Sequence, residues 1–440
     1  MSLAAASGSR PRVVILGGGF GGLHAARALR HAAVDVTVID RTNHHLFQPL
    51  LYQVATATLS PSDITVPIRW VLRGVDNAHV LLGEARGFDL GARTVLIDDD
   101  QRPIPYDYLI VATGARHSYF GHDEWEAHAP GLKSLDDALE IRRRFLLSFE
   151  LAEKCESDAE RAIHQTFIIV GAGPTGVELA GMLPELARKA FRRDFRRVDT
   201  RKTRVILVEG GPRILPTFAE SLSARATRDL AELGVEIRTN ALVTRVDGDG
   251  VFIGGDRIHS RTVFWAAGNR ASSLARRLGI PVDRAGRAIV EPDLSIPGHP
   301  EVFVIGDLAA AMSDGKPVPG VAPAATQAGA LAAANVLRSI RGEPRRPFRY
   351  VNKGELATIG RHRAIADLGF VRMAGTLAWF FWIFLHIMYL VGFRNRLVVL
   401  IQWAWAYVTY QRGARLITGR ERGAEEARIT HTGEFRIASG

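Results

Sequence analysis

Two glycine-rich segments of this 440-residue chain have the spacing that binds a pyrophosphate. Both fit the pattern G-x-G-x-x-G, with Gly17, Gly19 and Gly22 in the first and Gly171, Gly173 and Gly176 in the second. In such a loop the first glycine makes the turn after a strand, the second lets backbone approach a phosphate, and the third lets helix and strand pack closely. The free N–H groups and the helix dipole then attract the anion. One such loop is weak evidence, but two indicate two bound dinucleotides.

An acidic residue ends a later apolar strand pattern after each loop. Asp40 lies 18 residues after Gly22, close to the roughly 20 residues expected for a carboxylate that binds a ribose. Glu209 lies 38 residues after Gly171. We expect an extended basic helix around residues 188–197 to account for the longer spacing. With both acids in place, an ordinary strand–helix turn becomes a poor explanation of either loop.

The elements that must position these loops occur in the same order twice. Each loop and acid is followed by an apolar strand that reaches a glycine, at Thr113-Gly114 in the first half and at Gly268 in the second. A further strand ends in Gly306-Asp307, and an Ala-rich helix pattern follows over residues 322–337. This order predicts an α/β protein with two Rossmann-like dinucleotide-binding domains. We expect the first domain over residues 12–134 and 284–345, and the second over residues 135–283.

The cysteine and histidine content limits the chemistry. Cys155 is the only cysteine, so the chain has neither an intrachain disulfide nor a redox-active cysteine pair, which suits a reducing compartment. His44 and His45 are adjacent and lack the spacing of metal ligands. We therefore expect no metal.

The excess positive charge lies near the C-terminus. Residues 338–440 hold 17 Arg and Lys against 7 Asp and Glu, a difference equal to the net charge of +10 for the whole chain. The motifs and stacking platforms of nucleic-acid-binding proteins are missing, so we expect no nucleic-acid partner. Residues 373–393 and 397–410 are instead apolar, rich in Trp and Tyr, and flanked by arginine. That pattern is typical of helices at the anionic, cytoplasmic face of the cell membrane.

Residues 346–440 are accordingly expected to form a membrane-anchoring region of amphipathic helices. The stretch 373–393 is long enough to cross a bilayer, whereas 397–410 is too short to return. A pair of helices lying in the membrane interface is the alternative. A buried hairpin or a dimer interface also stays open, and with it a homodimer.

The chain resembles the two-dinucleotide-binding-domain flavoproteins and, within them, the type II NADH:quinone oxidoreductases, which do not pump protons. The marks of this resemblance are residues 45–56 (HLFQPLLYQVAT), the second loop continuing to Glu178, residues 353–361 (KGELATIGR) and residues 385–396 (LHIMYLVGFRNR). Disulfide reductases of the same superfamily carry a cysteine pair after the first acid. Its absence here argues against them and against sulfide:quinone oxidoreductases.

The resemblance implies FAD on the first loop, NADH on the second, and a membrane quinone as acceptor. It assigns FAD contacts to the first loop and to Asp40, Gln48, Thr113, Gly114, Gly306, Asp307 and Ala324. It assigns NADH contacts to the second loop and to Thr175, Glu209 and Gly268. Three catalytic roles also follow from the resemblance: Glu178 as a proton relay, Gln327 from the quinone-side motif, and Lys353 as a stabiliser of negative charge.

One departure from the family keeps other functions open. The quinone-side motif Ala-Gln-x-Ala-x-Gln has Pro323 in place of its first glutamine, which removes an amide that would contact the acceptor. An NADH reductase with a non-quinone acceptor, and a membrane-bound NADH sensor, are therefore alternatives. Three residues also have purely structural explanations. Glu178 can be a helix-dipole residue, Lys353 can form a surface ion pair, and His386 can be an ordinary interfacial histidine.

Overall fold

The structure is a computed structural model that describes residues 10–98, 102–391, 393–409 and 414–418. Residues 410–413 and those after 418, which the expected anchoring region includes, lie outside this part. The chain divides into two compact units, described separately below. The first consists of Met1–Leu46, Thr65–Arg116 and Asn269–Lys353, and the second of Phe47–Ile64, His117–Gly268 and Gly354–Gly440.

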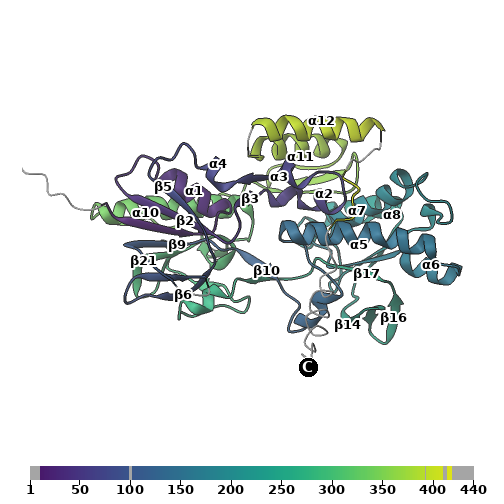
Figure 1. Ribbon diagram of the computed structural model, residues 1–440, viewed down its shortest axis with the longest axis horizontal. Helices are drawn as coiled ribbons and strands as arrows, with labels where there is room; N and C mark the ends of the chain where they lie inside the picture. Colours follow the sequence, from purple (N-terminus) through teal and green to yellow (C-terminus); the bar gives the residue numbers. More distant parts are fainter. Residues whose placement is uncertain (1–9, 99–101, 392, 410–413, 419–440) are drawn as a thin grey trace, which may run out of the picture. The chain divides into compact units, whose positions relative to one another are not determined.

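A six-stranded sheet forms the centre of the first unit (Figure 1). Its strands, in spatial order, are β20 (Ser295–Ile296), β21 (His299–Val304), β9 (Tyr108–Val111), β1 (Arg12–Leu16), β2 (Asp35–Asp40) and β5 (Ala78–Leu82). All neighbours pair in parallel except β20 with β21. Because parallel neighbours end at the same edge, the residues after β1, β9 and β21 gather there.

Two helices of this unit contact each other closely at a pair of glycines. A Cβ on Gly329 would lie 2.1 Å from the carbonyl oxygen of Gly21, so α1 (Phe20–Ala28) and α10 (Ala322–Ile340) touch backbone to backbone. The expected helix over residues 322–337 is confirmed. Pro323 lies in its first turn, where the missing N–H would have had no helical partner.

Short elements complete the first unit. They are β3 (His44–Leu46), β4 (Thr65–Pro67), α4 (Ile68–Val71), β6 (Ala85–Asp89), β7 (Thr94–Ile97), β8 (Arg102–Pro105), β18 (Asn269–Ala271), α9 (Leu274–Arg277), β19 (Ala288–Ile289), η5 (Gly306–Leu308), β22 (Ala309–Ala310), β23 (Met312–Ser313) and β24 (Lys316–Pro317). Strand β10 (Ala115–His117) pairs with β18 where the chain passes from one unit to the other.

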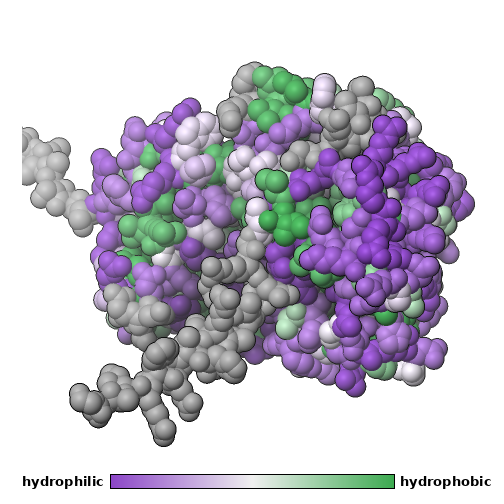
Figure 2. Space-filling view, turned by 45° about the vertical axis from the view of Figure 1, so that its right-hand side comes forward, coloured by the Kyte–Doolittle hydropathy of each residue, from purple (hydrophilic) through white to green (hydrophobic). Residues whose placement is uncertain are grey.

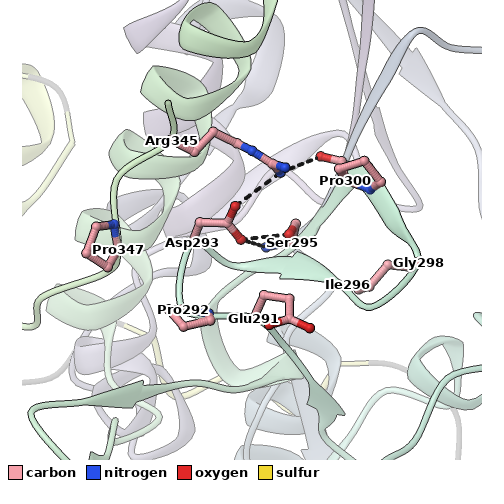
Figure 3. A pocket seen from close by; sticks show the side chains of 9 residues that line it. All are labelled: Glu291, Pro292, Asp293, Ser295, Ile296, Gly298, Pro300, Arg345 and Pro347. Atoms are coloured by element: carbon pink, nitrogen blue, oxygen red, sulfur yellow. Dashed lines mark hydrogen bonds and ion pairs between the residues drawn. The ribbon is translucent and has the colours of Figure 1, made fainter. Parts of the chain in front are cut away.

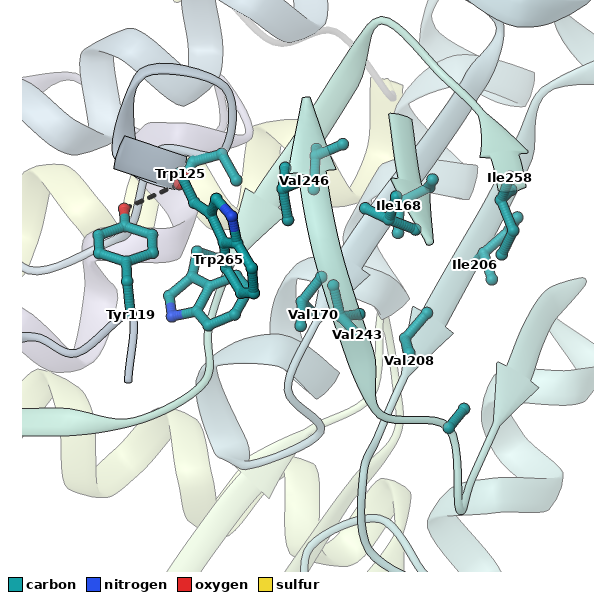
Figure 4. Packing of buried hydrophobic residues seen from close by; sticks show 14 residues of the cluster. Tyr119, Trp125, Ile168, Val170, Ile206, Val208, Val243, Val246, Ile258 and Trp265 are labelled. Atoms are coloured by element: carbon teal, nitrogen blue, oxygen red, sulfur yellow. Dashed lines mark hydrogen bonds between the residues drawn. The ribbon is translucent and has the colours of Figure 1, made fainter. Parts of the chain in front are cut away.

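The second unit is built on a four-stranded parallel sheet. Its strands, in spatial order, are β13 (Val235–Arg238), β12 (Arg204–Val208), β11 (Thr166–Val170) and β17 (Thr262–Trp265). Every residue of β11 and β17 is buried, as expected for parallel strands covered on both faces. Figure 4 shows valines and isoleucines of this sheet and of β14 (Val243–Asp247) in one core with Tyr119, Trp125 and Trp265.

Helices and small elements surround this sheet. They are η1 (Gln48–Leu50), α2 (Leu51–Ala55), α3 (Pro61–Ile64), η2 (Asp123–Ala127), α5 (Leu135–Lys154), α6 (Asp158–His164), α7 (Pro174–Glu185), η3 (Leu186–Ala190), η4 (Thr200–Lys202), α8 (Glu220–Glu232), β15 (Gly250–Ile253) and β16 (Asp256–His259). Residues 47–64 belong to this unit, although they lie far from the rest of it in sequence.

The extended basic helix expected around residues 188–197 is wrong. Helix α7 contains Pro184, which removes one helical hydrogen bond, and one wider π turn, η3, follows and ends at Ala190. Beyond it, the Glu153 carboxylate accepts backbone N–H groups of Arg196, Arg197 and Val198 at 2.9–3.0 Å. The long spacing before Glu209 is therefore a tethered loop.

The C-terminal part is a three-stranded antiparallel sheet followed by two helices: β25 (Glu355–Thr358), β26 (Ala364–Asp367), β27 (Arg372–Gly375), α11 (Thr376–Tyr389) and α12 (Phe393–Thr409). A single spanning helix over residues 373–393 is wrong, because the first three of these residues belong to β27 and α11 has only 14 residues. Within the described ranges, no helix combines the length and apolar character that a bilayer crossing requires.

Candidate dinucleotide-binding sites

The first glycine loop has the geometry of a phosphate cradle. Gly17 has a φ of 104°, and a Cβ there would lie 2.4 Å from the carbonyl oxygen of Ala112. A Cβ on Gly22 would lie 1.9 Å from the carbonyl oxygen of Gly17, so the first turn of α1 can pack against the loop only with a glycine at this position. Around Gly19, in contrast, no atom lies within 4 Å of the Cβ position. The glycine predicted to admit a phosphate is therefore the one with open space beside it.

Asp40 is held against this loop. Its carboxylate accepts the backbone N–H of Gly18 at 2.6 Å, and the N–H and hydroxyl of Thr42 at 2.7 and 2.8 Å. His45 reaches the other side of Gly18, with 3.1 Å between Nδ1 and the carbonyl oxygen. Burial lowers the pKa of His45 to about 4, so it is neutral when it donates this bond. The sequence analysis considered His45 as part of a motif and as a metal ligand, but not as a partner of Gly18, which lies 27 residues away.

The segment that follows strand β9 carries a buried hydroxyl that has no hydrogen-bond partner among the described residues. Thr113 Oγ1 is buried and makes no hydrogen bond, and the Cβ position of the next residue, Gly114, is open. Leaving a buried polar group unpaired costs about 1–3 kcal/mol. Because β9 lies beside β1, this hydroxyl is at the edge of the sheet that carries the first loop. It fits a group, such as FAD, that would supply the missing bond.

The late part of the first unit brings the remaining predicted residues to this edge. Gly306 and Asp307 follow β21, and a Cβ on Gly306 would lie 3.3 Å from that of Ala325, in the first turn of α10. The Asp307 carboxylate lies 3.3 Å from the Cβ position of Gly320. Ala324 is buried beside them. The first loop, Thr113, Asp307 and the start of α10 are thus arranged as FAD binding requires, although their contacts with FAD stay predictions.

The second loop repeats the geometry of the first. Gly171 has a φ of 99°, and a Cβ there would lie 2.6 Å from the backbone nitrogen of Ala267. A Cβ on Gly176 would lie 1.9 Å from the carbonyl oxygen of Gly171, and Gly173 again has open space. Thr175, half-buried, lies at the start of α7 between these two glycines. Two loops with the same restrictions at the same positions indicate two phosphate sites.

Glu209 corresponds to Asp40 in its contacts as well as its position. Its carboxylate accepts the backbone N–H of Ala172, in the loop, and of Gly211, each at 2.8 Å. Arg213, the nearby cation, donates to the carbonyl oxygens of Phe218 and Pro216. The acid is therefore fixed at the loop, while the arginine is engaged with its own turn.

Glu178 lies on α7, one turn beyond the second loop. It is half-buried, and burial raises its pKa well above the ordinary value of 4.5, only partly offset by a backbone hydrogen bond from Thr358. Here α7 meets the end of β25 closely, since a Cβ on Gly181 would lie 2.5 Å from the backbone nitrogen of Gly360. A raised pKa is common among residues that transfer protons, but the roles of Glu178 as a proton relay and as a helix-dipole residue both stay predictions.

A buried hydrogen-bonded chain runs from Thr358 to the C-terminal helices. The Thr358 and Tyr52 hydroxyls lie 3.0 Å apart, Gln53 donates to the Tyr52 hydroxyl at 3.0 Å, and Trp403 donates to Gln53 Oε1 at 2.7 Å. Tyr52, Gln53 and Thr358 are each at most 5% exposed. The sequence analysis missed this chain, because its members are some 350 residues apart and each reads as an ordinary motif or core residue.

Two predicted amides are already engaged with backbone. Gln327 both donates to and accepts from Val351, at 3.0 and 2.9 Å, and Gln48 donates to the carbonyl of Lys133 at 3.0 Å. Lys353 is exposed two residues after Val351. Gln327 therefore anchors the segment that carries Lys353, whatever else it contacts.

The two C-terminal helices present an apolar face to solvent. On α11 the exposed side chains follow the spacing of one helix face, and α12 adds more: Leu377, Phe380, Phe384, Met388, Leu397, Leu400, Ile401 and Trp405, each between 47% and 68% exposed. Figure 2 shows hydrophobic residues gathered at the top of the view, where Figure 1 places α11 and α12. On the inner side, Trp382 stacks on His386 and packs against Trp403. His386 also hydrogen-bonds through Nδ1 to the carbonyl oxygen of Trp382 at 2.8 Å, and its predicted place at a membrane interface stays a prediction.

A pocket of about 400 Å³ lies elsewhere in the first unit (Figure 3). Arg345 spans it, paired with Asp293 at 3.1 Å and bonded to the carbonyl of Pro300 at 2.8 Å. Pro300 is near the start of β21, whereas Gly306 follows its end, about 20 Å away for a six-residue strand. We do not assign this pocket to a nucleotide, because it lies at the opposite end of β21 from Gly306.

One group of metal-ligand types occurs among the described residues. Atoms of Cys155, Glu160 and His164 lie within 4.8 Å of one another. Burial raises the pKa of the Cys155 thiol, which disfavours the thiolate that a metal needs, and the Arg161 guanidinium donates to the carbonyl of Cys155. We assign no metal to this group.

Two family models match the chain. Residues 11–329 match "pyridine nucleotide-disulphide oxidoreductase", and residues 352–409 match the "NDH2 C-terminal domain". Together they cover both glycine loops and the sheet and helices at the C-terminus.

The chain is similar to several curated proteins over most of its length. It is 47% identical to the type II NADH:quinone oxidoreductase NdhA of Mycobacterium tuberculosis and 45% identical to Ndh of the same organism. Each alignment covers 94% of this chain and 91% of the relative. Identity to the type II NADH:quinone oxidoreductase of Staphylococcus aureus is 31%, covering 84% of this chain and 93% of the relative.

Solved structures share the fold. NDH2 from Plasmodium falciparum in complex with NADH has a TM-score of 0.85 at 23% identity, covering 92% of this chain and 99% of that one. The sulfide:quinone oxidoreductase of Aquifex aeolicus has a TM-score of 0.70 at 20% identity, covering 93% and 96%.

Proposed function

Because the chain belongs to the type II NADH:quinone oxidoreductase family, we propose that each glycine loop binds one of the two dinucleotides of that reaction. The first loop binds FAD and the second binds NADH. The protein is a flavoenzyme that passes electrons from NADH to a quinone without pumping protons. The repeated loop geometry supports two dinucleotide sites, because Gly19 and Gly173 are both open, and Asp40 and Glu209 are both bonded to their loops. The order, with FAD on the first loop and NADH on the second, follows the resemblance to the family.

FAD, when bound, takes up two electrons from NADH and releases them to the acceptor. The first loop supports its pyrophosphate, the unpaired Thr113 hydroxyl supplies a donor, and Asp307 supplies an acceptor. The N-terminus of α10 adds the positive end of a helix dipole at the same edge.

Glu178 is the proposed source of a proton for the acceptor. Reduction of a quinone to a quinol takes up two protons, and a carboxyl whose pKa is raised keeps its proton to higher pH than an ordinary glutamate and can release it to the acceptor. The backbone hydrogen bond from Thr358 fixes its position relative to β25. Pro323 leaves α10 intact, so the loss of the first motif glutamine changes acceptor contacts and not the helix.

The apolar face of α11 and α12 is proposed to bind an anionic lipid surface at the cytoplasmic face of the membrane. Its side chains are large, apolar and exposed, and residues 338–440, the part of the sequence that contains both helices, carry the excess of arginine and lysine. Apolar burial and lipid electrostatics together support such binding.

Anaerobic spectroscopy tests the proposed function directly. The purified protein is expected to show the flavin absorption bands, to lose them on addition of NADH, and to regain them on addition of a quinone analogue. A protein that binds NADH without loss of the flavin bands would contradict it.

NADH is expected to be preferred over NADPH by at least 30-fold in kcat/KM. A 2′-phosphate would meet the Glu209 carboxylate and displace a hydrogen bond, at a cost of roughly 2–5 kcal/mol. Arg213 cannot compensate without giving up its carbonyl partners. Glu209→Gln should reduce the ratio, and equal kcat/KM values in the unaltered protein would contradict the assignment of Glu209.

Phe380→Glu combined with Phe384→Glu is expected to weaken binding to anionic vesicles about 100-fold, measured by flotation. Each phenylalanine contributes about 1.5–3 kcal/mol when it is buried in lipid. Reduction of a soluble dye by NADH should be unchanged. Leu82→Glu, at an equally exposed apolar residue of β5, is the control and should bind vesicles normally. Unaltered flotation of the double variant would place the membrane surface elsewhere.

A further inference from the structure

Phe120 is an exposed aromatic residue beside a cluster of three buried ones. Tyr119, Trp125 and Trp265 are 2%, 6% and 3% exposed and form one cluster (Figure 4). Phe120 is 67% exposed, although its ring centroid lies only 6.4 Å from that of Trp265. The cluster therefore holds the segment in place while one ring points away from the core.

The backbone of Phe120 is strained. Its φ is 55°, in the left-handed region that bulky side chains avoid and glycine adopts easily. The segment is nevertheless fixed: Trp265 Nε1 donates to the carbonyl of Ser118 at 2.9 Å, and the Ser118 N–H donates to the carbonyl of Gly268 at 3.3 Å. A strained backbone that is kept in a segment fixed by hydrogen bonds suggests a functional use of its side chain.

The Phe120 ring lies over the edge of the second nucleotide site. A Cβ on Gly268 would lie 2.6 Å from Phe120 Cζ, so the ring covers the glycine turn that ends β17. The next residue back, Ala267, has its nitrogen 2.6 Å from the Cβ position of Gly171, the first glycine of the loop. The Phe120 ring therefore lies next to the glycine turn, and the turn lies next to the phosphate loop.

The position of Glu209 decides which half of NADH would reach this ring. Strand β11 has β12 on one side and β17 on the other, and a dinucleotide crosses such a sheet at this point. Glu209 follows β12, and the exposed side chain of Leu242 lies beside the adjoining Gly210. With the adenosine ribose at Glu209 and the pyrophosphate on the loop, the nicotinamide half must extend toward β17.

We propose that Phe120 is a positioning residue for NADH, whose ring packs against the nicotinamide riboside half and selects the bound pose. This rests on the proposed placement of NADH at the second loop. The contact is apolar and specific to one end of the dinucleotide. The affinity of ligands that lack nicotinamide should therefore not depend on Phe120.

Transient kinetics of the full-length, FAD-loaded protein tests the proposal. Phe120→Ala is expected to raise the Kd for NADH, taken from the NADH dependence of flavin reduction, by about 10-fold. The inhibition constant of ADP-ribose, which lacks nicotinamide, should stay within twofold of the unaltered protein. Phe120→Tyr, which keeps the ring, should restore the Kd. Phe370→Ala is the matched control, because Phe370 is 89% exposed on the turn between β26 and β27 of the same unit, and should change neither constant.

A second variant separates positioning from a structural role. Phe120→Gly removes both the ring and the strain, so it should raise the Kd for NADH as alanine does while raising the thermal midpoint. A lowered midpoint together with equal weakening of NADH and ADP-ribose would overturn the proposal, as would an unchanged Kd for NADH in Phe120→Ala. If ADP-ribose fails to compete with NADH even in the unaltered protein, the placement of NADH at the second loop is itself wrong.

Discussion

Gly176→Ala is expected to abolish NADH oxidation while FAD stays bound. Its Cβ would lie 1.9 Å from the carbonyl oxygen of Gly171, so α7 would have to move away from β11 and open the phosphate loop. Such a clash between backbone and side chain costs about 2–3 kcal/mol or more, equivalent to at least ~30-fold in Kd for NADH. The flavin absorption of the purified variant and its bleaching by NADH measure the two effects separately.

The corresponding substitution in the first loop should remove FAD binding and leave the second dinucleotide site intact. Gly22→Ala places a Cβ 1.9 Å from the carbonyl oxygen of Gly17 and should yield protein without flavin that still binds ADP-ribose. Gly255→Ala, with open space at its Cβ position, is the control and should behave normally. Loss of FAD from Gly176→Ala, with NADH binding retained, would reverse the assignment of the two loops.

Glu178→Gln is expected to slow quinone reduction by about 100- to 1000-fold, within the usual range for loss of a general acid. The amide has the same shape and can donate a hydrogen bond, but it cannot transfer a proton. Flavin reduction by NADH in single-turnover experiments should change less than threefold. Wild-type rates in both half-reactions would reduce Glu178 to a structural residue.

The same variant should be more stable than the unaltered protein above neutral pH. Burial raises the pKa of Glu178 in the folded state, so the folded state holds its proton more tightly than the unfolded state does. Stability from this group is complete below the ordinary pKa of about 4.5 and is lost as pH rises toward the raised folded value. Glutamine has no such loss, so the thermal midpoint of the variant should decline less between pH 5 and pH 8.

The two loops, their acids and the strands around them were predictable, because their signals are local. Gly17 and Gly171 need left-handed backbone, Gly22 and Gly176 need close packing, and both requirements appear as glycines at fixed spacing. The Ala-rich helix after Asp307 was predictable for the same reason. In each case, short-range stereochemistry limits the residue types.

What the sequence could not reveal depends on contacts between distant segments. The assignment of residues 47–64 to the second unit depends on pairs such as Tyr52 with Thr358 and Gln53 with Trp403. The basic stretch after Ala190 was predicted to be helical, because no local sequence signal shows that the Glu153 carboxylate binds the backbone N–H groups of this stretch. Phe120 has no motif at all, and only its φ and exposure distinguish it.

The interrupted order of the first unit sets the sequence of events during synthesis on the ribosome. Strand β9 ends at Val111, but its neighbour β21 begins only at His299, and α10, which touches α1 through Gly329 and Gly21, comes later still. The parallel sheet of the second unit lies wholly between them, at residues 166–265. A nascent chain can thus complete the second dinucleotide sheet while β9 is still an unpaired edge. With FAD on the first loop, as proposed, flavin insertion follows the pairing of β9 with β21, and until then the free edge of β9 is open to pairing with other chains.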